Sequence, residues 1–231
     1  MMHCLNGENK YSIFREIISS VIHDLKNPLS AITLGLEFIE MSDKGKNSQQ
    51  AISGAITSAA RIDQLLDALS MFFHDEDAPP TTVPFSHLLH RARLLVGYYF
   101  ARNQIKFQIE DGGSDQSVLM NLDQAYQGMV LLLVGLAKRS VHGGEVRATV
   151  QSDPNAQSVV FLITPPEPDQ TSGPPADPVP SDNLAVVCFD TARGLFRASG
   201  IELNLPDSWA SPARIVLRKA IDGAIPPQME G

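Results

Sequence analysis

Two long helical patterns occupy the first third of the chain. Between Tyr11 and about Met41, apolar residues recur at steps of three and four, which predicts one buried face of a helix. Turn residues follow at 42–47, and the same spacing from Gln50 to about Phe73 predicts a second helix. We expect the two to pair as an antiparallel hairpin. Because one pairing cannot bury two wide apolar stripes, the hairpin is predicted to form a homodimeric four-helix bundle, with a monomeric core as the alternative.

The remaining sequence alternates between helical and strand patterns. The segment from His74 to Thr82 is acidic and contains two prolines, which indicates a linker. Beyond it we expect helices packed on one face of a mixed sheet. Predicted helices cover 85–101, 122–140 and 184–199, and predicted strands cover 104–110, 145–151, 158–164, 201–205 and 213–218. The predicted fold class is α+β, with a helical hairpin at 1–76, an α/β sandwich at 83–220 and a tail at 221–231.

Composition excludes several classes of function. A chain of 231 residues can form one large or two small domains. Its formal charge of −8 argues against a nucleic-acid partner. No stretch reaches the roughly 18 apolar residues of a membrane span, and the N-terminus lacks the pattern of a signal peptide. Cys4 and Cys188 lie far apart without metal-ligand spacing, so we expect neither a disulfide framework nor a metal site, and a cytoplasmic location fits.

The stretch Ile22-His23-Asp24-Leu25-Lys26-Asn27-Pro28-Leu29 places a histidine beside a carboxylate within the first predicted helix. Imidazole is a good nucleophile, and Asp24 can fix the tautomer of His23 and raise the nucleophilicity of its other nitrogen. Pro28 costs a helix interior about 3 kcal/mol or more, so its presence there implies a use. On composition alone, a structural or solvated histidine is the alternative.

These eight residues resemble the phosphoacceptor box of two-component histidine kinases, which runs His, Asp or Glu, an aliphatic residue, Lys or Arg, Asn or Thr, Pro, Leu. The resemblance implies that His23 accepts a phosphoryl group and that Asp24 is its acid/base partner. Asn27, one helical turn later, is expected to face the same site. In the bundle, His23 should face outward while Ile22 and Leu25 turn inward.

In order and length, the second part is similar to the ATP-binding domain of these kinases, but it departs from the family at the nucleotide motifs. Leu132 and Leu136 stand where the kinase helix carries two asparagines for nucleotide and Mg²⁺. The stretch 161–168 has no Asp-x-Gly-x-Gly turn, and no Gly-x-Gly motif occurs near 182–185. A Pro-rich loop at 164–181 takes the place of the nucleotide lid, and a solvated surface loop is its favoured interpretation. We therefore expect no bound nucleotide or other cofactor.

A complete histidine box beside such a domain predicts phosphotransfer without a kinase, and the resemblance narrows to dimeric histidine phosphotransferases of the ChpT type. His23 would take a phosphoryl group from the aspartate of one response-regulator receiver and pass it to another, with Mg²⁺ supplied by the receiver. The receiver is expected to touch Leu29 and Leu66, with Lys26 near the phosphoryl oxygens or the receiver's acidic pocket. The alternatives are a non-enzymatic dimeric adaptor or inhibitor, a divergent ATP-dependent kinase, and a phosphatase role for Asn27.

Overall fold

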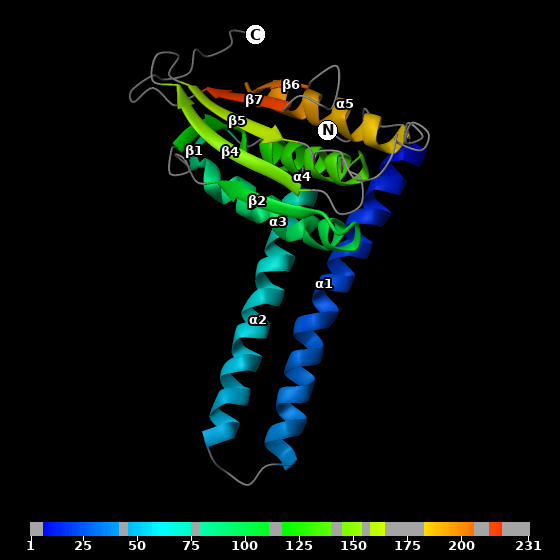
Figure 1. The fold of residues 1–231 in the computed structure, drawn as a ribbon, viewed down its shortest axis with the longest axis vertical. Coiled ribbons are helices and arrows are strands. Elements are labelled where there is room, and N and C mark those ends of the chain that lie inside the picture. The colour runs from blue at the N-terminus through cyan, green and yellow to red at the C-terminus, as the bar shows by residue number, and fades with distance from the viewer. Residues whose placement is uncertain are drawn as a thin grey trace, which may run out of the picture.

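The chain forms a long helical hairpin that carries an α/β head at one end (Figure 1). The computed structural model describes residues 7–41, 46–74, 79–110, 117–139, 145–153, 158–164, 183–205 and 213–218. Within these ranges no helix is long and apolar enough to cross a membrane. The predicted Pro-rich loop beyond Thr164, the tail at 221–231, the acidic linker residues 75–77 and Cys4 lie outside the described residues.

Both helices of the predicted hairpin are confirmed. The first, α1, spans Gly7–Met41 with 35 residues, and the second, α2, spans Lys46–Phe73 with 28 residues. Helix α1 contains Pro28 in its interior. Because proline has no backbone N–H, the carbonyl of Asp24, four residues earlier, lacks its usual helical hydrogen bond. The proline therefore alters the backbone at one of the two residues expected to carry the chemistry.

The head contains a five-stranded mixed sheet, which confirms the predicted arrangement. The strand order is β2-β4-β5-β7-β6, in which β2 and β4 run parallel and every other neighbouring pair is antiparallel. The strands are β2 (Lys106–Glu110), β4 (Glu145–Asp153), β5 (Ser158–Thr164), β6 (Glu202–Asn204) and β7 (Ala213–Arg218).

Three helices, α3 (Phe85–Arg102), α4 (Leu122–Arg139) and α5 (Asn183–Ala198), form a layer against one side of this sheet (Figure 1). Every residue of α4 from 125 to 137 is buried, as expected for a helix whose residues are mostly apolar on every side. Gly135 permits close packing with α5, because a Cβ atom there would lie 2.7 Å from the ring of Phe189. The predicted helices and the α+β class are thus confirmed.

Two short strands were not predicted. Strand β1 (Thr81–Pro84) pairs with β3 (Ser117–Met120) in a separate antiparallel sheet. The linker prediction is therefore wrong at its end, because Thr81 and Thr82 belong to a strand. Four residues are too few to display a clear period of two. The predicted strand start at Gln104 is also wrong, since this residue lies in the turn after α3 with φ of 55°, in the left-handed region.

The base of the hairpin shares one hydrophobic core with the head. Its buried residues on α1 and α2 belong to the same cluster as the buried side chains of α3, α4 and α5. Those hairpin residues are Ile13, Ile17, Val21, Ala68 and Phe72. Because the core is continuous, the boundaries at 76 and 83 stay a prediction.

Hydrogen bonds from side chains to backbone carbonyls also join the hairpin to the head. The Ser20 hydroxyl donates to the carbonyl of Leu95 over 3.2 Å, which ties α1 to α3. The Tyr126 hydroxyl on α4 lies 3.0 Å from the carbonyl of Ala68 and 3.3 Å from that of Arg91. These contacts connect α1 to α3, and α4 to both α2 and α3. Because buried polar groups are costly to leave unpaired, they favour one orientation of the hairpin relative to the head.

Candidate phosphoacceptor site

His23 lies on the exposed surface of α1, next to the junction with the head. Its side chain is 48% exposed, while that of Asp24 is only 17% exposed. His23 Nδ1 lies 3.8 Å from Asp24 Oδ1, close enough for electrostatic attraction but longer than a hydrogen bond. The outward orientation of His23 is confirmed. Leu25 is partly buried against the core as expected. Ile22 is 50% exposed in the single chain, and its inward orientation in a dimeric bundle stays a prediction.

The ring of Tyr98 on α3 stacks on the His23 imidazole. The ring centroids are 3.9 Å apart and the ring planes are inclined by 28°. Tyr98 was not among the predicted site residues, because it is far from His23 along the chain and belongs to the head. The tyrosine pair within the helical pattern at 85–101 was the only signal, and no spacing rule links it to His23.

The Asp24 carboxylate lies against the backbone of α3. A Cβ atom built on Gly97 would lie 3.8 Å from Asp24 Oδ2. Burial raises the pKa of Asp24, while the neighbouring His23, the positive charge of Arg61 and a hydrogen bond with the backbone of Tyr98 lower it by less. A carboxylate with a raised pKa holds a proton more readily than usual, which suits an acid/base partner of a histidine.

The other predicted site residues are exposed along the hairpin. Lys26 and Asn27, which follow Leu25 on α1, are both exposed. The predicted receiver contacts Leu29 and Leu66 are exposed by 57% and 46%, respectively. They are accessible for a partner, and their roles stay predictions.

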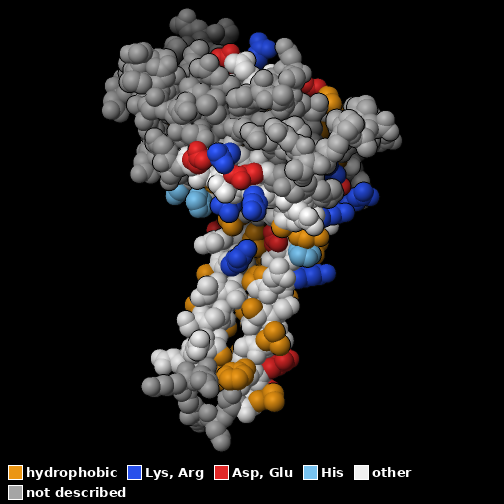
Figure 2. All heavy atoms as spheres, in the orientation of Figure 1, with side chains coloured by type: hydrophobic (Ala, Val, Ile, Leu, Met, Phe, Trp, Pro, Cys, Tyr) orange, Lys and Arg blue, Asp and Glu red, His pale blue; other side chains and the backbone are white. Residues whose placement is uncertain are grey.

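The distal part of the hairpin, away from the head, exposes many large apolar side chains (Figure 2). Leu34 is 65% exposed and Met41 is 87% exposed. Others on the two helices beyond the site are Leu29, Leu36, Phe38, Ile52 and Ile56. So many exposed large apolar side chains on one pair of helices are typical of a protein interface.

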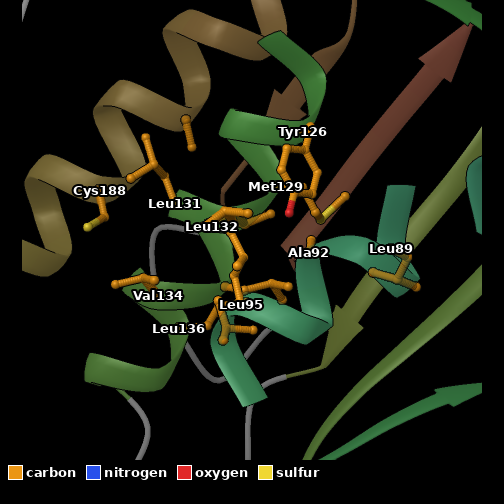
Figure 3. Packing of buried hydrophobic residues seen from close by; sticks show 14 of the residues in the cluster. Leu89, Ala92, Leu95, Tyr126, Met129, Leu131, Leu132, Val134, Leu136 and Cys188 are labelled. Carbon is orange, nitrogen blue, oxygen red and sulfur yellow. The ribbon is translucent and has the colours of Figure 1, made fainter. Parts of the chain in front are cut away.

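The two leucines predicted to replace the kinase asparagines lie inside the core. The exposed fractions of Leu132 and Leu136 are 0% and 1%, respectively. Leu136 lies beside Leu95 of α3, and Leu131 points toward Cys188 on α5 (Figure 3). Both faces of α4 are therefore occupied by neighbouring helices at this level. Of the two stretches predicted to lack the glycine motifs, 161–164 belongs to β5 and 183–185 opens α5, while 165–168 and 182 lie outside the described residues.

Comparison with known proteins identifies the hairpin. Residues 15–77 match the His Kinase A (phospho-acceptor) domain. Over these residues, the hairpin is therefore similar to the phosphoacceptor domain of histidine kinases. No curated protein sequence matches the chain.

Several solved structures are similar at low identity. The catalytic domain of histidine kinase ThkA is 14% identical, with a TM-score of 0.46 over 62% of this chain and 97% of that one. A bacterial phosphotransferase is 16% identical, with a TM-score of 0.41 over 92% of this chain and 97% of that one. The Acinetobacter baumannii histidine kinase AdeS is 11% identical, with a TM-score of 0.44 over 86% and 97%. None of these TM-scores reaches 0.5, so they establish no shared activity.

Proposed function

We propose that this protein is a dimeric histidine phosphotransferase of a two-component phosphorelay that works without ATP. The proposal rests on a contrast between the phosphoacceptor box and helix α4 of the same chain. The phosphoacceptor box is complete and His23 is half exposed beside Asp24, whereas Leu132 and Leu136 are buried where a kinase would place asparagines. The protein would exchange phosphoryl groups with receivers and would not draw them from nucleotide.

In the proposed reaction His23 is the nucleophile. Its Nε2 lone pair attacks the phosphorus of an aspartyl phosphate, and the bond between phosphorus and the aspartate oxygen breaks as its electrons return to the carboxylate. The proton on Nδ1 faces Asp24, which balances the positive charge that develops on the ring. Such transfer passes through a loose transition state, so positioning and charge neutralisation supply most of the barrier reduction. The reverse sequence passes the phosphoryl group to a second receiver, and the receiver's own Mg²⁺ would neutralise the phosphoryl oxygens.

Leu132 and Leu136 do not fit a nucleotide-bound Mg²⁺. This ion requires hard oxygen ligands in near-octahedral geometry, and leucine offers none. Leu132 and Leu136 are also packed between helices, so a nucleotide could reach them only if the core opened. Nucleotide binding is therefore absent from the proposed function.

The apolar distal hairpin supports the homodimer. Two copies would bury Leu34, Met41 and their neighbours in a four-helix bundle, which removes their side chains from water. The exposed Lys26 and Leu29, together with Leu66, would then remain candidates for contact with a receiver.

A radiolabel transfer assay tests the proposal. Purified protein is mixed in one reaction with labelled ATP and in another with labelled phosphoreceiver, each beside a His23→Ala variant. His90→Ala is the matched control, because His90 is another exposed helical histidine. We expect label to reach the wild type and the His90→Ala variant only from the receiver, and not to reach His23→Ala.

The other outcomes separate the alternative functions. Label from ATP would establish a divergent kinase, and ATP would then also raise the melting temperature, since a ligand stabilises the state that it binds. No label from either donor, with several receivers tried, would favour a non-enzymatic adaptor.

A further inference from the structure

The contact between Tyr98 and His23 joins the phosphoacceptor helix to the head. The two rings stack at 3.9 Å between centroids with an inclination of 28°. Tyr98 is itself half-buried on α3, and the adjacent Gly97 lies against the carboxylate of Asp24. The same turn of α3 therefore touches both residues expected to carry the chemistry.

We propose that Tyr98 is a positioning residue for phosphoryl transfer, which holds the His23 imidazole with Nδ1 toward Asp24 and leaves Nε2 free for the phosphoryl group. This inference rests on the proposed function. A surface histidine can adopt several rotamers, and most of them would separate Nδ1 from Asp24. A ring stacked on one face of the imidazole restricts this freedom, which lowers the entropy lost when the reactive geometry forms.

Stacking leaves the reactive edge of His23 accessible. The lone pair of an imidazole nitrogen lies in the plane of the ring, whereas Tyr98 covers a face. The His23 side chain remains 48% exposed with Tyr98 in place. A phosphoryl group can thus approach Nε2 along the ring plane without displacement of Tyr98.

The tyrosine ring also suits the charge that develops during transfer. When Nε2 bonds to phosphorus and Nδ1 keeps its proton, the imidazole becomes positively charged. The face of an aromatic ring attracts a cation. Tyr98 on the face and Asp24 at the Nδ1 edge would therefore stabilise the same charge from two directions.

Single-turnover transfer from a labelled phosphoreceiver tests the proposal with Tyr98→Ala, Tyr98→Phe and the control His90→Ala on the same helix. The maximal rate and the receiver concentration at half-maximal rate are measured separately. We expect Tyr98→Ala to lower the maximal rate about tenfold, the size of effect associated with one lost stacking and cation–π contact, with receiver affinity unchanged. Tyr98→Phe keeps the ring and is expected to stay within about twofold of the wild type.

Nuclear magnetic resonance of the His23 side chain provides a readout that does not depend on activity. In the wild type and in Tyr98→Phe, the carbon-bound ring protons of His23 should be shifted upfield by the stacked ring, and the ¹⁵N shifts should indicate one dominant tautomer. Tyr98→Ala should lose both signatures. Thermal unfolding of each variant verifies that the head remains folded.

Several results would overturn the inference while the proposed function stands. These are an unchanged or faster rate in Tyr98→Ala, a defect confined to receiver affinity, an equal loss in Tyr98→Phe, or unchanged His23 resonances in Tyr98→Ala. If the wild type takes no label from any receiver, the proposed function itself fails, and the role of Tyr98 in transfer fails with it.

Discussion

The substitution Leu132→Asn tests whether position 132 belongs to the hydrophobic core or to a nucleotide-binding site. If this part of α4 were a nucleotide site that had lost one polar side chain, asparagine would restore a polar group that faces the nucleotide. In the structure, however, Leu132 has an exposed fraction of 0% and lies within the cluster formed by α3, α4 and α5 (Figure 3). The asparagine amide would therefore enter an apolar core.

The expected cost follows from two terms. Truncation of a buried leucine costs about 2 to 5 kcal/mol, and asparagine recovers only part of that packing. An amide that is buried without hydrogen-bond partners costs about 1 to 3 kcal/mol more. The two ranges add to about 3 to 8 kcal/mol before the packing that asparagine recovers, which is a large share of the roughly 5 to 15 kcal/mol that keeps a typical domain folded.

Urea denaturation followed by circular dichroism measures this loss, and thermal unfolding with and without ATP tests for nucleotide binding. The matched control is Val186→Asn, because Val186 is 43% exposed on α5 and the two residue types have similar helix propensities. We expect the control to change stability by less than about 0.5 kcal/mol. A loss below about 1 kcal/mol in Leu132→Asn, or a melting temperature raised by ATP, would refute the assignment of this position to a closed core.

Three further predictions concern other parts of the molecule. Asp24→Asn should increase the free energy of unfolding at pH 7, because the burial that raises the pKa of Asp24 penalises only its charged form. The gain should vanish well below pH 3.8, where the carboxyl is neutral in the folded and the unfolded state. Urea titrations of both proteins across this pH range measure the gain, and a gain that grows as the pH falls would contradict the reasoning. Tyr126→Phe should lower the free energy of unfolding by about 1 to 2 kcal/mol, because it removes the hydroxyl that contacts the carbonyls of Ala68 and Arg91, and an unchanged urea midpoint would contradict this. Leu34→Glu should shift the protein from dimer to monomer in light scattering after size-exclusion chromatography, and an unchanged mass would show that this part of the hairpin is not the interface.

The sequence alone was enough to predict the helices whose apolar residues recur regularly over a long stretch of the chain. The spacing of apolar residues predicted α1 and α2 nearly to their ends, and the same signal located α4. The phosphoacceptor box could also be recognised directly, because its residues are consecutive. The outward orientation of His23 was predicted from the expected helical bundle, in which Ile22 and Leu25 turn inward.

Only the tertiary structure decided which distant residues meet. It paired β1 with β3, whose four-residue strands carry too little periodicity to predict, and it left Ile22 exposed in the single chain. It also brought Tyr98 onto His23. Helical spacing reports neighbours within one or two turns, whereas a contact between α1 and α3 depends on how the shared core orients the hairpin against the head. The chemistry of the site is therefore encoded in one short segment, but its support depends on packing across the whole chain.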